Sequence, residues 1–75
     1  MKNLVQTTEG ERGVLSKIAG DKRFLSRITS VGLTVGTEVE VIQNQGRYPI
    51  LLHARDSVLA INRQEAANIS MEVEK

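Results

Sequence analysis

Two glycines, Gly32 and Gly36, mark the point where the hydrophobic pattern of this chain changes from a helical period to a strand period. Before Gly32, apolar residues recur every three or four positions, and after Gly36 polar and apolar residues alternate. Glycine adopts positive φ without steric cost, so Gly32 is placed to end a helix and Gly36 to be the third residue of a type II turn. We predict that the fold depends on the turn formed by Gly32, Leu33 and Gly36, with Leu33 returning to the core.

The residues before Gly32 predict one amphipathic helix. Asp21 can cap its N-terminus, because an aspartate side chain accepts hydrogen bonds from the first free backbone N–H groups. One apolar stripe at helical spacing follows, made of Phe24, Leu25, Ile28 and Val31. We expect this stripe to face the core, and Arg23, Arg27 and Ser30 to lie on the opposite face.

Five segments are expected to form strands, because they are short, rich in β-branched residues or alternating in polarity. They are residues 12–19, residues 38–41, residues 50–55, residues 57–61 and residues 69–74. The unbroken apolar run at 57–61 predicts a central strand covered on both faces. Asn62 and Glu65 have the spacing of a capping box, which predicts a short helical turn before the last strand. Gly10 and Gly13 are expected to serve a turn.

The chain has 75 residues and no cysteine, so it has room for one core, which packing alone must stabilise. We therefore expect a single domain, residues 1–75, that is mainly β. A small barrel of about five strands with one inserted helix fits this pattern, because closure removes exposed sheet edges. Neither a signal-peptide run nor a segment of membrane-spanning length is present, which predicts a cytoplasmic protein.

Catalytic and metal-binding patterns are scarce in the sequence. The only histidine is His53, and no phosphate-binding glycine motif occurs. Glu38 and Glu40 project from one strand face, but a transition metal needs several converging His, Cys or carboxylate ligands. We predict no enzyme activity, no catalytic residue, no cofactor and no metal site.

The formal net charge is only +1, yet bases gather between Arg12 and Arg27, where five bases accompany one acid. This stretch is either a normally solvated surface or a face that binds a partner. As partner-binding candidates we name Lys17, Arg23, Arg27, Arg47, Tyr48 and Pro49. A nucleic-acid partner is disfavoured, because Phe24 is expected to be buried and Tyr48 alone does not make a stacking platform.

Six short motifs, in this order and spacing, resemble the FeoA family over nearly the whole chain. They are GxxG at 10–13, VGLTVG at 31–36, VxV at 39–41, PILL at 49–52, VLAI at 58–61 and EAAxI at 65–69. Val35 stands where that family commonly has proline, which leaves the turn looser but keeps the glycine that follows.

This resemblance implies an SH3-like β-barrel with an inserted helix. It also implies a cytoplasmic accessory of ferrous iron uptake that binds the FeoB-type transporter, a membrane protein with a GTP-binding domain. The same fold is similar to the C-terminal domain of iron-dependent repressors. The alternative is therefore a stand-alone SH3-like module that binds nucleic acid or another regulatory partner.

Overall fold

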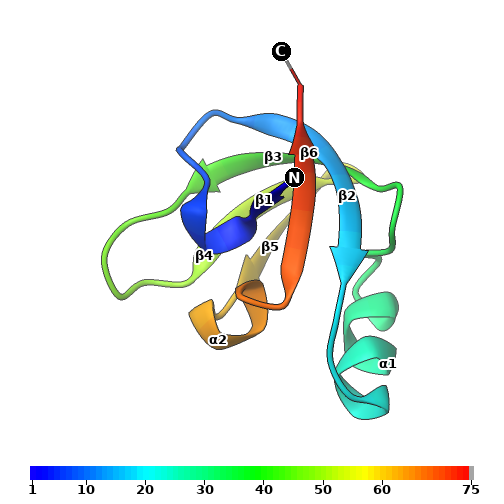
Figure 1. Ribbon diagram of the computed structural model, residues 1–75. Helices are drawn as coiled ribbons and strands as arrows, with labels where there is room; N and C mark the ends of the chain where they lie inside the picture. The colour runs from blue at the N-terminus through cyan, green and yellow to red at the C-terminus, as the bar shows by residue number, and fades with distance from the viewer. Residues whose placement is uncertain (75) are drawn as a thin grey trace.

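The computed structural model describes residues 1–74 and is built on one antiparallel sheet (Figure 1). Its strands follow the order β1-β6-β2-β3-β4-β5 across the sheet. The elements along the chain are β1 (Lys2–Asn3), the 3-10 helix η1 (Leu4–Gln6), β2 (Arg12–Ile18), α1 (Lys22–Ser30), β3 (Glu38–Gln43), β4 (Ile50–Ala54), β5 (Ser57–Ile61), α2 (Arg63–Ala66) and β6 (Ile69–Val73). The predicted mainly β fold, with one longer helix and a short helical turn before the last strand, is confirmed.

β1 was not among the five strands predicted from the sequence. It pairs with the last strand, with Lys2 opposite Met71 and Asn3 opposite Ser70. Two residues are too few to show an alternating pattern, so the strand leaves no periodic signal. Asn3 then caps η1 in a capping box with Gln6, which fixes the chain direction after the strand.

The prediction of a central, doubly covered strand at 57–61 is wrong. β5 pairs only with β4 and lies at one edge of the sheet. The side chain of Val58 is 59% exposed, and only Ile61 of this strand is fully buried. A short apolar run reports hydrophobicity but not the number of neighbouring strands, so it does not distinguish an edge from a centre.

Both ends of α1 follow the sequence signals. The Asp21 side chain accepts a hydrogen bond of 2.8 Å from the backbone N–H of Phe24. At the other end Gly32 has φ +97°, its N–H donates to Thr29, and the N–H of Leu33 donates to Ile28, which is the Schellman pattern. The glycine stop is therefore confirmed.

The turn after the helix also matches the prediction. Gly36 has φ +96°, and the backbone N–H of Thr37 donates to the carbonyl of Thr34 at 3.1 Å. Leu33 is fully buried, as expected of the residue that returns to the core. No helix among residues 1–74 is long and apolar enough to cross a membrane.

The apolar stripe of α1 is only half covered. Ile28 is fully buried and Phe24 packs partly against the core, whereas Leu25 is 37% and Val31 41% exposed. The helix lies beyond the end of β2 rather than flat against the sheet (Figure 1), so only one edge of the stripe reaches the core.

The core lies inside the curved sheet and is made of inward-facing side chains from most elements. The largest fully buried ones are Leu4, Leu15, Ile28, Leu33, Val41, Ile50, Leu52, Ile69 and Met71. Gly13, expected in a turn, lies inside β2 instead. A Cβ at this position would be 2.1 Å from the carbonyl oxygen of Glu72, so glycine is required by the close approach of β6.

Candidate functional site

The six predicted partner-binding residues fall into two separate groups. Lys17 lies on β2, and Arg23 and Arg27 lie on α1, which follows it in the chain. The other three, Arg47, Tyr48 and Pro49, lie in the loop between β3 and β4. That loop and α1 are on opposite sides of the molecule (Figure 1), so the structure does not bring the two groups together.

Arg27 has a partner within the chain. Its guanidinium forms an ion pair with the carboxylate of Glu65 in α2, and the Glu65 side chain is only 19% exposed. Asn62 caps α2 as predicted by accepting a hydrogen bond from the N–H of Glu65. The Glu65 carboxylate is thus used to join the two helices. Lys17 and Arg23, both exposed, have no ion pair within residues 1–74.

The loop between β3 and β4 projects exposed side chains from an ordered turn. The N–H of Tyr48 donates to the carbonyl of Gln45 at 3.1 Å, and Gly46 between them has φ +50°. The Tyr48 ring is 65% exposed, and Arg47 and Pro49 beside it are exposed as well. Exposed aromatic rings on ordered loops are common at protein-binding surfaces.

The Asn44 side chain links this loop to the rest of the chain by hydrogen bonds. The sequence did not predict this role of Asn44. Its side-chain amide donates to the carbonyl of Thr7 at 2.7 Å and to that of Val5 at 3.3 Å. Its carbonyl oxygen accepts a hydrogen bond of 2.6 Å from Arg63 of α2. One side chain therefore ties the N-terminal segment, the β3–β4 loop and α2 together.

A second contact stabilises the N-terminal segment. The backbone N–H of Thr8 donates to the Glu11 carboxylate, and the ammonium group of Lys2 lies 3.0 Å from the same carboxylate. Both contacts lower the pKa of Glu11 below its usual value, and the hydrogen bond from the Thr8 backbone has the larger effect.

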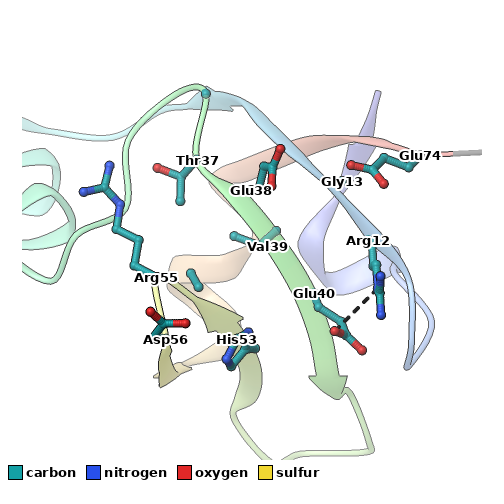
Figure 2. A pocket seen from close by; sticks show the side chains of 12 residues that line it. Arg12, Gly13, Thr37, Glu38, Val39, Glu40, His53, Arg55, Asp56 and Glu74 are labelled. Carbon is teal, nitrogen blue, oxygen red and sulfur yellow. Dashed lines mark ion pairs between the residues drawn. The ribbon is translucent and has the colours of Figure 1, made fainter.

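A groove with a volume of about 610 Å³ opens on another face, between the start of β3, the end of β4 and the start of β2 (Figure 2). Its lining includes four buried residues, Gly13, Thr37, Val39 and Ala54. Its rim is charged and contains Arg12, Glu38, Glu40, His53, Arg55, Asp56 and Glu74.

Local strand geometry explains this rim. Because side chains alternate along β3, Val39 and Val41 are buried while Glu38 and Glu40 face away from the core, as predicted. Glu40 lies opposite His53 on β4, and its carboxylate is 3.5 Å from Nε of Arg12 on β2.

The turn that connects β4 to β5 adds two charges to the rim. Arg55 and Asp56 both have positive φ, 52° and 63°, as a two-residue type I′ hairpin turn requires. A tight turn near Asp56 was expected from the sequence. The position of this turn next to β3 was not expected, because it depends on the pairing of β3 with β4.

The groove does not have the arrangement of a metal centre. Within residues 1–74, no group of three or more His, Cys, Asp or Glu side chains is placed to hold a metal ion. His53 and Glu40 lie side by side as cross-strand neighbours with Arg12 beside them, which makes a charged surface.

The FeoA domain model matches residues 2–73 of this chain. The chain belongs to the FeoA family. A Methanocaldococcus jannaschii protein provisionally named Fe(2+) transport protein A is 32% identical over 72 residues, which cover 96% of this FeoA chain and 87% of that protein.

Solved structures share the fold of this FeoA chain. The crystal structure of an iron uptake regulatory protein, FeoA, aligns with TM-score 0.90 at 22% identity and covers 96% of both chains. Stenotrophomonas maltophilia FeoA, solved with zinc and described as a prokaryotic SH3 domain protein, aligns with TM-score 0.76 at 19% identity over 96% of this chain and 89% of its own.

A third solved structure relates the fold to transcriptional regulators. A manganese-dependent transcriptional repressor aligns with TM-score 0.90 at 16% identity, and the alignment covers 97% of this chain but only 41% of the repressor. The expected SH3-like fold is confirmed by these neighbours.

Proposed function

We propose that this FeoA-family chain is a cytoplasmic accessory protein of ferrous iron uptake that binds a FeoB-type transporter and modulates it through protein–protein contacts. It acts as a binding module and carries out no catalysis of its own. The family match over residues 2–73 carries the proposal. The names of two relatives support it, since one is provisionally named an Fe(2+) transport protein and the other is described with a suggested role as a bacterial ferrous iron transport activating factor.

Two exposed surfaces are available for this contact. One contains the exposed cations Lys17 on β2 and Lys22 and Arg23 in the first turn of α1. The other is the loop with Arg47 and Tyr48. Electrostatic complementarity at such surfaces mainly accelerates association, because it steers the partners before contact.

Surface plasmon resonance against the cytoplasmic GTP-binding part of the transporter, with and without nucleotide, tests the proposal. The double change Lys17→Glu and Arg23→Glu should slow association at low salt and leave the melting temperature nearly unchanged. Arg27 is kept, because its loss would leave Glu65 without a partner.

Tyr48→Ala provides an independent arm of the same experiment. Loss of an exposed aromatic anchor should speed dissociation instead of slowing association. Absence of binding by the unmodified protein under all nucleotide conditions would refute the proposed function.

A further inference from the structure

The sheet has two edge strands, β1 and β5, which differ in how open they are to pairing with another chain. β1 has only two residues, one of them Lys2, and the chain turns into η1 directly after it. Short strands and edge lysines both prevent pairing between molecules. β5 has five residues, Ser57–Ile61, with no charged residue, no proline and no bulge in its pairing with β4. The β5 edge therefore lacks the features that usually protect an edge strand.

The hydrogen-bond pattern of the β4–β5 hairpin shows which backbone groups of β5 are free. The two-residue turn makes Ala54 and Ser57 the first hydrogen-bonded pair, and bonded and non-bonded pairs alternate along an antiparallel ladder. Leu59 is then bonded to β4 as well, whereas the N–H and C=O groups of Val58 and Ala60 point to the free edge. Within residues 1–74, these groups have no hydrogen-bond partner.

The side chains along this edge are apolar on both faces of the sheet. On the outer face, Val58 is 59% exposed and Ala60 is exposed beside it. On the inner face, Leu59 packs against the core but is only partly buried. An open edge of this kind is a template for another extended chain, because the backbone groups and the apolar side chains can both be covered by it.

The β5 strand itself has the pattern that this edge accepts. In an antiparallel pairing of two β5 strands about a two-fold axis at Leu59, Val58 of each copy lies opposite Ala60 of the other. This arrangement gives every free N–H and C=O group of these residues a partner. The two Leu59 side chains then form a non-hydrogen-bonded pair, in which side chains approach most closely, and each covers the exposed part of the other.

Charges at the two ends of β5 favour the antiparallel direction. Asp56 precedes the strand and Arg63 follows it, and neither has an ion pair within residues 1–74. In the antiparallel pairing, Asp56 of one copy lies at the end of the strand where Arg63 of the other copy begins α2. The Arg55 side chain extends toward α1 instead, since its Cδ lies 3.9 Å from the position of a Cβ on Gly32. Opposite charges therefore meet at both ends, whereas a parallel pairing would place Asp56 beside Asp56.

We propose that the chain forms a two-fold symmetric dimer by antiparallel pairing of two β5 strands, so that one sheet continues across both copies. Two five-residue strands make a smaller contact than the about 1,200–2,000 Å² of stable protein–protein interfaces. The dimer is therefore weak, with a dissociation constant of about 10 µM to 1 mM. This inference goes beyond the proposed function and does not depend on it, because neither iron nor the transporter takes part in the pairing.

Sedimentation equilibrium of the full-length protein, over concentrations that span this range, measures the dissociation constant. Val58→Lys places a charge on the exposed edge and should weaken the dimer at least about tenfold. Val35→Lys is the matched control, because Val35 is 62% exposed and lies in the turn before β3. It makes the same change in charge and should alter the dissociation constant less than about twofold. Both variants should keep nearly the same melting temperature, since the replaced side chains are exposed.

A single introduced thiol tests the register, because the chain has no cysteine. Leu59→Cys places two thiols across the axis, where the Cα atoms of a non-hydrogen-bonded pair are about 4.5 Å apart, a distance that a disulfide can span. Ser57→Cys is the control on the same strand face, because the two thiols would be about 14 Å apart along the strands. With oxidised glutathione as the oxidant, which is reduced as the two thiols are joined, Leu59→Cys should form a covalent dimer at least about tenfold faster than Ser57→Cys.

Leu59 packs against the core, so the melting temperature of Leu59→Cys is measured first. If that variant does not fold, the comparison of Val58→Lys with Val35→Lys decides the question, since neither change touches the core. A monomer at millimolar concentration, equal weakening by the two lysine variants, or equal rates of crosslinking by two folded cysteine variants would each overturn the proposal. Pairing of β5 with an extended segment of the transporter, while the protein alone stays monomeric, would overturn it as well.

Discussion

Replacing Gly13 by alanine tests how closely β2 and β6 approach each other. The added Cβ would lie 2.1 Å from the carbonyl oxygen of Glu72 and 2.6 Å from the terminal methyl of Met71. The methionine end is flexible, but the carbonyl oxygen belongs to a paired strand, since Gly13 lies opposite Val73. Ordinary contact needs at least 3.4 Å, so the two strands would have to separate locally by more than 1 Å.

Overpacking of this kind costs about 1–3 kcal/mol, and each backbone hydrogen bond lost from the β2–β6 pairing adds about 0.5–1.5 kcal/mol. We therefore expect Gly13→Ala to lower the free energy of unfolding by about 2–4 kcal/mol. In a domain of this size that lowers the melting temperature by at least about 8 °C. Urea denaturation followed by circular dichroism, with the slope checked for constancy, measures the loss.

Gly36→Ala is the matched control. A Cβ at Gly36 has no atom within 4 Å, so alanine meets only the backbone cost of φ +96°, about 1–2 kcal/mol. Gly36→Val should lose more, because a β-branched residue resists positive φ more strongly. If Gly13→Ala unfolds at the same urea concentration as the unmodified protein, the close approach of β2 and β6 described above is wrong.

Four further results are expected. Asn44→Ala should lower the free energy of unfolding by about 2–3 kcal/mol in urea titrations, because several backbone carbonyls lose their donor, and a loss under about 0.5 kcal/mol would contradict the network. A double-mutant cycle of Arg27→Ala and Glu65→Ala should give a coupling of about 0.5–1 kcal/mol that decreases with salt, and zero coupling at low salt would show that the ion pair does not stabilise the fold. Val35→Pro should leave stability unchanged or raise it by about 0.4–1 kcal/mol, and a lower melting temperature would mean that φ at this position does not suit proline. The folded state lowers the pKa of Glu11, so ionised Glu11 stabilises the fold above the usual glutamate pKa, and this stabilisation is lost as pH falls through the lowered pKa. Glu11→Gln should therefore make the free energy of unfolding depend less on pH in the acid range.

The local signals in the sequence predicted the helix and its surroundings well. Asp21 and Gly32 carry their information in single side chains or in the lack of one, and the contacts they make span at most a few residues. Turn chemistry at Gly36 is equally local. Such features follow from the local backbone conformation and from hydrogen bonds to nearby residues, so they depend little on tertiary packing.

Features that depend on distant partners were not readable. β5 lies at the sheet edge because only β4 pairs with it. The apolar run in its sequence does not indicate how many strands pair with it. Asn44 gave no signal, because the partners of its side chain lie at least 19 residues away in the sequence. The groove brings together residues that are distant in the sequence, so the outward direction of Glu38 was predicted but its place beside a groove also lined by Asp56 was not.

The pairing of β1 with β6 has a consequence for folding during synthesis on the ribosome. β6 lies between β1 and β2 in the sheet, yet it follows every other described element along the chain and is therefore synthesised after them. Lys2 and Asn3 therefore remain unpaired until β6 has left the exit tunnel, because their partners Met71 and Ser70 are not available before then. Contacts of such high sequence separation form slowly. The sheet is therefore completed only after β6 has been synthesised, when β1 and β6 come together.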